Sequence, residues 1–346
     1  MASSGSPTLE RSLSPSSPLD KNVPSPPWTI PRDALARKEK VGAGQFGIVH
    51  RALWNGASVA MKTLKPGGGR QAKADFLAET EVMQRLQHPN IVQFHGRCEE
   101  AANDDADAPP FLVTELSTGG SLQDYFQRRS KRLPLSREIE LAIDCAKALN
   151  YLHATANVVH RDLKPANLLI FFGNNSGSCS SNLRNKGTLK LTDFGLSKRL
   201  PGKQSAESPA QYKMTGETGS FRYMAPEVYR HEDYNHKVDV YAFGMILFQL
   251  LEGRQPFAFL TPEQGAAAAS LKDIRPAFKA LRRPRFNAMR RLIERCWAPL
   301  PEDRPEFEIL VPQLEACLEE VKAWEGIKWW ETLFKKGGGK VSPSKN

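Results

Sequence analysis

The sequence contains few cysteines and no paired cysteine motif. Its five cysteines are Cys98, Cys145, Cys179, Cys296 and Cys317, scattered along 346 residues without C-x-x-C spacing. An odd and scattered set argues against a disulfide framework and against a zinc site, and it is typical of a reducing compartment. We therefore expect the protein to work in the cytoplasm.

The sequence also lacks long apolar runs, targeting signals and repeats. It has no run of eighteen apolar residues, so no transmembrane helix is predicted. The N-terminus has no apolar signal-peptide core, and Ala2 does not fit the myristoylation pattern. No repeat with a period of 20–50 residues is visible. Because 40% of the residues are hydrophobic and 25% are charged, we expect an ordinary globular protein.

Basic residues outnumber acidic ones, 48 to 38, which gives a net charge of +10. Two clusters hold many of them: Arg282, Arg283, Arg285, Arg290 and Arg291 in the first, and Lys328, Lys335, Lys336, Lys340 and Lys345 in the second. Basic surfaces favour anionic partners such as acidic proteins, phosphates or anionic lipids. A merely solvated basic face is the alternative. No motif leads us to expect nucleic acid as a partner.

The two ends differ in composition from the rest of the chain. Residues 1–32 are rich in Ser and Pro and are predicted to be disordered, because they bury too little apolar surface to offset the entropy of ordering. Residues 326–346 form a basic tail, and 335–346 are predicted to be disordered for the same reason. The stretch GIKWWETLFKK in this tail is a candidate for weak contact with a membrane surface or a partner. Packing against the large lobe is the alternative.

Between the ends, strand patterns come first and helical patterns follow. Residues 33–115 contain β-like runs, two of which flank the turn WNG, and one helical pattern at 72–87. From residue 121 to residue 325 helical patterns dominate, at 136–153, 238–252, 285–297 and 306–323. The segment 115–120, which contains two glycines, joins the two parts as a hinge. This order predicts an α+β protein of two lobes with a ligand cleft between them.

A glycine-rich stretch, GAGQFGIV at 42–49, lies early in the small lobe. Gly42, Gly44 and Gly47 form a G-x-G-x-x-G pattern, and glycine lets backbone N–H groups approach phosphate oxygens closely. A dinucleotide-binding fingerprint needs a preceding strand and a following helix. Here a strand follows, so the stretch is predicted to be a flap between two strands.

Lys62 ends the apolar run VAMK. A buried lysine is costly unless an anion pairs with it, although a lysine at the end of a strand can also reach water. Glu79 in the predicted helix is the best candidate for its partner, because Glu81 points to another face of that helix.

Polar residues are crowded in HRDLKPANLL, 160–169, and again in LTDFG, 191–195. Asp162 can accept a proton from an attacking hydroxyl, and Lys164 can neutralise charge on a transferring phosphoryl group. Asn167 and Asp193 offer oxygen atoms to a hard cation such as Mg²⁺. A solvated loop ahead of a strand is the alternative.

Taken together and in this order, these motifs resemble a eukaryotic protein kinase over residues 33–325. The resemblance implies the bilobal kinase fold, with a small antiparallel-sheet lobe (33–115), a hinge (115–120) and a larger helical lobe (121–325). It implies ATP and Mg²⁺ as cofactors and proteins as substrates. Its nucleotide-binding residues would be Val41, Gly42, Gly44, Gly47, Val49, Ala60, Lys62, Thr114, Glu115, Leu116, Ser121 and Asp193.

The resemblance also implies catalytic roles. Lys62, held by Glu79, would contact the α- and β-phosphates, and Asp162 would be the catalytic base. Lys164 would neutralise charge, and Asn167 and Asp193 would bind Mg²⁺.

Two further motifs match structural features of the kinase family. Ala225-Pro226-Glu227 would close the activation segment, and Arg304 would pair with Glu227. The stretch DVYAFG, 239–244, resembles the start of the central helix of the large lobe.

The adenine and ribose contacts follow from the same resemblance. Thr114 falls at the gatekeeper position, although a plain β-strand threonine is an equal alternative. Glu115 and Leu116 would hydrogen bond to adenine through their backbone groups, and Ser121 would contact the ribose.

Other stretches resemble the tyrosine-kinase-like group, which includes Raf-like, mixed-lineage and integrin-linked-type kinases. These are ALWNG before VAMK, GSFRYMAPEV, and CWAPLPEDRP. Lys164 is the residue type of serine/threonine kinases, and tyrosine stays open as a minor acceptor. A catalytically weak ATP-binding scaffold is the rival function, against which the presence of Lys62, Asp162, Asn167 and Asp193 argues.

Regulation is implied at the activation segment. Arg161 would gather a phosphorylated loop, with Thr215 or Thr218 as the expected site. Ser220 would help to hold Asp162 and Lys164. An exposed and unmodified loop is the alternative.

The stretch 171–187 is longer than the turn that the family usually has there. It is rich in Gly, Asn and Ser, so it is expected to loop out as a passive insertion without disturbing Asp193. A regulatory or docking role is the alternative.

Overall fold

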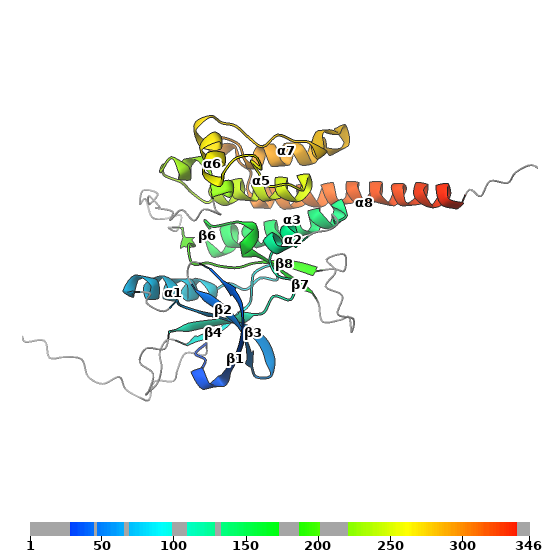
Figure 1. The fold of residues 1–346 in the computed structure, drawn as a ribbon. Coiled ribbons are helices and arrows are strands. Elements are labelled where there is room, and N and C mark those ends of the chain that lie inside the picture. The colour runs from blue at the N-terminus through cyan, green and yellow to red at the C-terminus, as the bar shows by residue number, and fades with distance from the viewer. Residues whose placement is uncertain are drawn as a thin grey trace, which may run out of the picture.

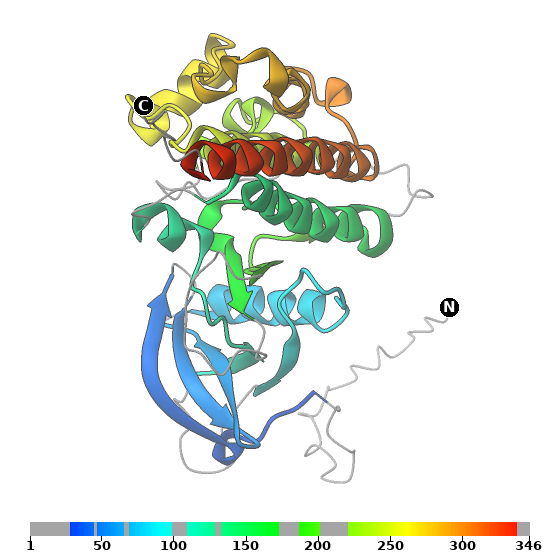
Figure 2. The ribbon, with the colours of Figure 1, turned by 90° about the vertical axis from the view of Figure 1, so that its right-hand side faces the viewer.

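The computed structural model describes residues 28–44, 47–65, 69–98, 109–128, 133–172, 187–200 and 221–337, with side chains as far as residue 326. The described chain forms two lobes, a small lobe built on a sheet and a larger helical lobe (Figures 1 and 2). This arrangement confirms the predicted α+β, bilobal fold.

A five-stranded antiparallel sheet forms the core of the small lobe, in the order β1-β2-β3-β5-β4. Its strands are β1 (Leu35–Ala43), β2 (Ile48–Trp54), β3 (Ala57–Thr63), β4 (Phe94–Cys98) and β5 (Phe111–Glu115). The β2–β3 hairpin turns at Asn55 and Gly56, whose φ angles are 48° and 78°. Both residues tolerate the left-handed conformation that a two-residue hairpin requires, so the predicted turn forms where the Asn-Gly pair stands.

Helix α1 (Arg70–Met83) is the main helix of this lobe, and it buries Phe76, Glu79 and Met83. It ends four residues before the predicted limit at 87. The amides of Arg85 and Leu86 donate to carbonyls three residues back, which closes the helix with tighter turns.

Residues 28–32, assigned above to a disordered segment, lie along β4. The Ile30 amide donates to the Arg97 carbonyl (2.9 Å), and the Arg97 amide donates to the Trp28 carbonyl (2.8 Å). Ile30 is buried in the core of the small lobe. At Gly96, a Cβ atom would stand 2.5 Å from the Trp28 carbonyl oxygen, so the close approach of this segment depends on glycine. These contacts order residues 28–32.

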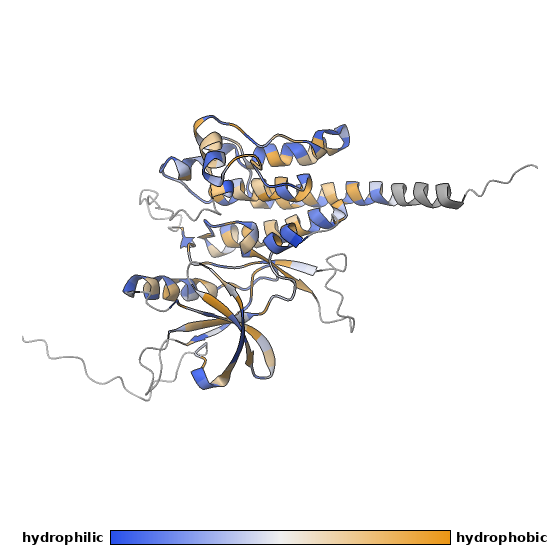
Figure 3. Cartoon of the chain, in the orientation of Figure 1, coloured by the Kyte–Doolittle hydropathy of each residue, from blue (hydrophilic) through white to orange (hydrophobic). Residues whose placement is uncertain are grey.

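The large lobe is mainly helical. Its α-helices are α2 (Leu122–Arg128), α3 (Leu135–Asn150), α4 (Pro226–Tyr229), α5 (Lys237–Glu252), α6 (Pro262–Leu271), α7 (Asn287–Cys296) and α8 (Phe307–Gly337). All residues of α5 are buried, and α5 contacts both α3 and α7. Its mainly hydrophobic colouring in Figure 3 fits this central place, where apolar side chains leave water on every side.

Two short strand pairs and several short helices complete the large lobe. The pairs are β6 (Val158–Val159) with β9 (Lys198–Arg199), and β7 (Leu168–Phe172) with β8 (Gly187–Leu191). The short helices of this lobe are η2 (Tyr151–Ala156), η3 (Pro165–Asn167), η4 (Phe221–Tyr223), η5 (Ala280–Arg282), η6 (Pro284–Phe286) and η7 (Pro301–Asp303), whereas η1 (Arg32–Ala34) precedes β1 in the small lobe. Strands β7 and β8 pair in register on both sides of the insertion, of which residues 173–186 lie outside the described residues.

Two large-lobe helices differ from the sequence-based expectations. Helix α6 was not predicted, because its run of alanines lacks an apolar stripe; its signal is the capping box between Thr261 and Gln264. Helix α8 continues to Gly337 rather than ending at 323, so residues 335–337, expected to be disordered, are helical. Within the described parts of the chain, no helix combines the length and apolar character needed to cross a bilayer.

Candidate active site

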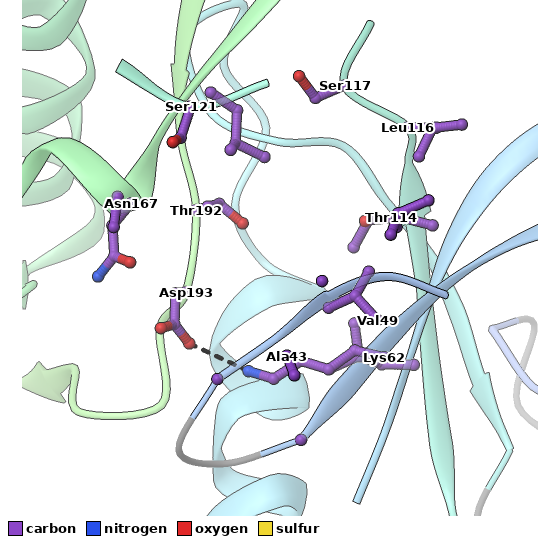
Figure 4. A pocket seen from close by; sticks show the side chains of 18 of the residues that line it. Ala43, Val49, Lys62, Thr114, Leu116, Ser117, Ser121, Asn167, Thr192 and Asp193 are labelled. Carbon is purple, nitrogen blue, oxygen red and sulfur yellow. Dashed lines mark hydrogen bonds and ion pairs between the residues drawn. The ribbon is translucent and has the colours of Figure 1, made fainter. Parts of the chain in front are cut away.

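A cavity of about 770 Å³ lies between the two lobes. Every residue assigned above to nucleotide binding lines it, including Val41, Val49 and Ala60 from the sheet and Leu116 from the hinge. Figure 4 shows Val49, Leu116 and Ser121 around one space, with Lys62 and Asp193 joined by an ion pair at its edge. The volume falls within the range of small-molecule sites in proteins.

Lys62 lies at the centre of a buried charge network. Its Nζ atom is 2.7 Å from Oε1 of Glu79 and 3.0 Å from Oδ1 of Asp193, so α1 and the Asp193 segment are joined through one ammonium group. Burial lowers the pKa of Lys62, but the negative charges of Glu79 and Asp193 outweigh burial and raise that pKa overall. Lys62 therefore carries its positive charge at neutral pH, with the charge facing the cavity.

The Asp162 carboxylate is fixed by neighbours from its own loop. Oδ2 of Asp162 lies 2.8 Å from Nζ of Lys164 and accepts a hydrogen bond from Nδ2 of Asn167 at 3.1 Å. The same Nδ2 donates to the Asp162 carbonyl at 2.8 Å. Lys164 and Asn167 line the large cavity, whereas Asp162 lines a small adjoining cavity of about 20 Å³ with Tyr223. Asp162 therefore lies beside the nucleotide-sized cavity, in contact with two of the residues that line it.

Asp239, at the start of α5, holds this loop from below. Its carboxylate accepts hydrogen bonds from the amides of His160 (2.8 Å) and Arg161 (2.9 Å) and lies 2.8 Å from Nε2 of His153. Burial raises the pKa of Asp239, but His153 and the backbone amide of His160 lower it overall. Arg161 has a φ of 67°, an uncommon backbone conformation for a non-glycine residue. The sequence analysis did not assign this anchoring role to Asp239.

Asp193 reaches the cavity because the next residue points away from it. Phe194 is buried and its ring packs against His160, with the ring centroids 5.3 Å apart. Asp193 itself has a φ of 65°, which turns the chain sharply between the buried ring and the half-buried carboxylate that faces the cavity. Burial raises the pKa of Asp193, but the charge of Lys62 outweighs burial and lowers that pKa. The carboxylate is therefore ionised at neutral pH.

The glycines of the flap serve different purposes. The Gly44 amide donates to the Gly47 carbonyl at 2.9 Å, which closes the turn at the tip of the flap. At Gly44 a Cβ atom would meet nothing within 4 Å, whereas at Gly47 it would stand 2.4 Å from the Thr63 carbonyl oxygen. Gly47 is thus required by packing against β3, in addition to the phosphate contact that the sequence suggested.

We predict that Gly47→Ala lowers the thermal stability of the nucleotide-free protein, while Gly44→Ala leaves it nearly unchanged. Overpacking against backbone costs about 1–3 kcal/mol, because the carbonyl cannot move like the end of a flexible side chain. Thermal unfolding of both variants beside the wild type checks this. Equal melting temperatures for the two variants would contradict the packing argument.

At the hinge, Thr114 lines the cavity and its Oγ1 atom donates to the Glu115 carbonyl at 3.2 Å. The Glu115 amide donates to the Gln93 carbonyl at 3.0 Å, so that amide is not available to an adenine base. The Glu115 carboxylate binds Nζ of Lys190 at 2.6 and 2.8 Å, which joins the hinge to β8. The carbonyl of Glu115 accepts from Thr114 but has a second lone pair, so the carbonyl rather than the amide remains for a ligand.

Ser121 lies at the other side of the cavity, at the start of α2. Its Oγ atom donates to Oδ2 of Asp124 at 2.9 Å, and the Asp124 amide donates back to that Oγ at 3.1 Å. Burial raises the pKa of Asp124, but hydrogen bonds from Ser121 lower it overall. The ribose-contact position therefore presents a hydroxyl and an ionised carboxylate together.

The regulatory residues are only partly described. Thr215, Thr218 and Ser220 lie outside the described residues. The Arg161 guanidinium donates to the carbonyl of Leu196 and to the Tyr234 hydroxyl, the latter at 3.3 Å.

The predicted pairing of Arg304 with Glu227 is present. Their side chains form two hydrogen bonds, of 2.6 and 2.9 Å, and both are buried.

Several residues that line the cavity were missed by the sequence analysis. They are Met83, Leu112, Ser117, Gly120, Asp124, Ala166, Leu169 and Thr192, together with Ala43, Arg51 and Lys65. Leu169 reaches the cavity because β7 forms a bridge with Ser121.

Comparison with known proteins indicates the same family that the sequence motifs resemble. A family profile described as protein tyrosine and serine/threonine kinase matches residues 35–314. The chain is 39% identical over 282 residues to serine/threonine-protein kinase VIK of Arabidopsis thaliana, which covers 81% of this chain and 59% of VIK. It is 37% identical over 294 residues to serine/threonine-protein kinase CTR1 of the same plant, covering 84% of this chain and 32% of CTR1.

A third relative from Arabidopsis thaliana is serine/threonine/tyrosine-protein kinase HT1. The identity is 32% over 308 residues, which covers 87% of this chain and 70% of HT1. The chain spans less than two thirds of the length of VIK and of CTR1. The profile covers most of the described lobes, and the matched residues include the whole charge network around the cavity. The chain therefore belongs to the protein tyrosine and serine/threonine kinase family, as a serine/threonine kinase domain of the tyrosine-kinase-like group.

Proposed function

We propose that this chain transfers the γ-phosphoryl group of ATP to serine and threonine hydroxyls of proteins, with Mg²⁺ as its cofactor. One observation carries the proposal: Lys62, Asn167 and Asp193 line a single cavity, and Asp162 adjoins it. Lys62 is already joined to Glu79, and Phe194 is buried away from the cavity. The arrangement has the parts that phosphoryl transfer needs, which are positioned cations, metal ligands and a base.

The residues present fit a magnesium ion. Nδ2 of Asn167 is turned toward Asp162, which leaves Oδ1 as the atom on the side of the cavity (Figure 4). Asp193 is ionised, and its Oδ1 atom faces Lys62, which leaves Oδ2 as the second oxygen for a cation. Carboxylate and amide oxygens are ligands that Mg²⁺ prefers. Bound there, the ion would neutralise charge on the phosphates of ATP.

The chain's own residues then act on the reacting groups. Lys62 binds phosphate oxygens of ATP with a charge that Glu79 keeps in place. Asp162 accepts the proton of the substrate hydroxyl, and Lys164 stabilises negative charge on the transferring group. A bond forms between the hydroxyl oxygen and the γ-phosphorus, the bond from that phosphorus to the β–γ bridging oxygen breaks, and ADP leaves.

A catalytically weak ATP-binding scaffold is the second candidate. The intact network of Lys62, Glu79 and Asp193 disfavours the scaffold. A scaffold binds ATP without transferring phosphate, so it needs neither the ionised Asp193 nor a positioned base such as Asp162. Tyrosine as an additional acceptor is supported only by the similarity to HT1, a serine/threonine/tyrosine-protein kinase.

We also propose regulation by phosphorylation of the activation segment. A phosphate on Thr215 or Thr218 would bind the Arg161 guanidinium through charge-assisted hydrogen bonds. Because Arg161 neighbours Asp162 and shares the support of Asp239, such a contact would order the segment beside the base. The scattered cysteines support a cytoplasmic location.

Transfer of labelled phosphate from ATP to a mixture of acidic and basic proteins tests the proposed activity. We expect label on protein in the presence of Mg²⁺ and none after chelation of the metal with EDTA. If ATP and Mg²⁺ raise the melting temperature of the chain but no label is transferred after phosphorylation of the activation segment has been verified, the scaffold would replace the kinase as our conclusion.

A further inference from the structure

The first basic cluster lies at one end of the large lobe. Arg282, Arg283 and Arg285 belong to η5, η6 and the residue between them, and Arg291 lies on α7. Both η5 and η6 contact α7, so these arginines share one continuous region. Figures 1 and 2 show α7 at the end of the large lobe that faces away from the small-lobe sheet. A surface bound at this end of the large lobe would therefore leave the cleft between the lobes accessible.

These arginines make no ion pair with a described acidic residue, although Arg285 contacts aromatic rings. All four side chains are exposed, and no acidic residue among the described ones pairs with Arg282, Arg283, Arg285 or Arg291. The fifth arginine of the cluster, Arg290, is paired with Glu294 at 3.5 Å. Unpaired guanidinium groups are weakly hydrated and fit phosphate oxygens in a bidentate manner.

The structure also joins this cluster to α8. The Arg285 guanidinium lies 4.6 Å from the ring centroid of Trp324 and 5.1 Å from that of Phe286. Both aromatic side chains are partly exposed. Trp324 belongs to α8 and Phe286 to η6. Aromatic side chains from two elements that are far apart in the sequence therefore accompany the arginines at one place.

We propose that this region, the η5–η6–α7 arginines with Phe286 and Trp324, binds the surface of a membrane that contains anionic lipids. Arginine supplies the attraction to lipid phosphates, and tryptophan and phenylalanine prefer the boundary between headgroups and acyl chains. An acidic protein surface would use the charges but would not require the aromatic residues that accompany them. The region lies away from the cleft, so the bound chain keeps its cavity accessible.

The test is co-sedimentation of the full chain with vesicles of phosphatidylcholine, with or without about one third phosphatidylserine. The variant Arg282→Gln/Arg283→Gln/Arg291→Gln removes three exposed charges and leaves the stacked Arg285 in place. The matched control Arg37→Gln/Lys38→Gln/Lys40→Gln removes three exposed charges from β1 in the small lobe. Equal melting temperatures for both variants and the wild type establish that the two variants are folded.

We expect the wild type to bind the anionic vesicles, to release them at high salt, and to ignore neutral vesicles. The α7-side variant should bind about tenfold more weakly or worse, and the β1 control should bind like the wild type. Equal losses in both variants would overturn the proposal, because net charge alone would then explain binding. Absence of vesicle binding, with retention on immobilised polyglutamate, would also overturn it in favour of an acidic protein surface.

Discussion

Replacing Asp162 with asparagine lowers phosphoryl transfer by about a thousandfold, because a positioned general base contributes roughly 10²–10⁴ in rate. The asparagine has the same shape and still fits between Lys164 and Asn167, but it cannot take the hydroxyl proton. The loop keeps its support, because the backbone amides of His160 and Arg161 remain bound to Asp239. Initial rates with saturating ATP and a protein acceptor measure the effect.

Binding of ATP serves as the control for this variant. Asp162 does not line the main cavity, so the increase in melting temperature caused by ATP and Mg²⁺ should equal that of the wild type. A rate within tenfold of the wild type would contradict the role of Asp162 as the base. A lost response to ATP would instead indicate that the loop had rearranged.

Replacing Arg304 with methionine destabilises the protein by about 3–5 kcal/mol, because it leaves the buried Glu227 carboxylate without a partner. Besides its two bonds to Glu227, Arg304 donates to the carbonyls of Ala298 (2.9 Å), Lys237 (3.2 Å) and Pro299 (3.2 Å). One side chain thus joins the closing motif of the activation segment to the start of α5. Thermal unfolding should show a decrease of about 10 °C in melting temperature.

A double variant separates the lost charge pair from the lost hydrogen bonds. Glu227→Gln combined with Arg304→Met removes both charges, so its destabilisation should be smaller than the sum of the two single effects. The exposed Arg37→Met is the matched control, with an expected change within about 0.5 kcal/mol. Strict additivity of the two single variants would mean that the pair contributes nothing as a pair.

The sequence contained enough to predict the two lobes and most of the cavity. Gly47, Lys62, Asn167 and Asp193 belong to motifs whose order resembles one family, and the structure places them around a single space. The paired strands β2 and β3 were readable because an Asn-Gly turn separates two apolar runs.

Other features depend on contacts between distant segments, which local patterns do not encode. Asp239 reads as part of an apolar helix, and its role at His160 and Arg161 emerges only when α5 packs beneath the loop. The ordering of residues 28–32 needs Gly96 on β4, to whose neighbour Arg97 they are hydrogen bonded. Helix α6 lacks a stripe of large apolar residues, because the face that it buries consists of the small residues Gly265, Ala266, Ala269 and Ser270.

The backbone contacts of Glu115 have the same origin. A backbone amide looks free in any sequence, yet here the Gln93 carbonyl takes it. The Lys190 side chain then binds the Glu115 carboxylate and leaves its carbonyl for the ligand. Which backbone groups face a cavity is decided by the packing of strands.

Phosphoamino-acid analysis of the labelled products tests the central claim most directly. Wild type and Asp162→Asn would be incubated in parallel with labelled ATP, Mg²⁺ and a mixed protein acceptor. We expect phosphoserine and phosphothreonine from the wild type and neither from the variant. Phosphotyrosine as the main product, or equal labelling by both proteins, would contradict a serine/threonine kinase that uses Asp162 as its base.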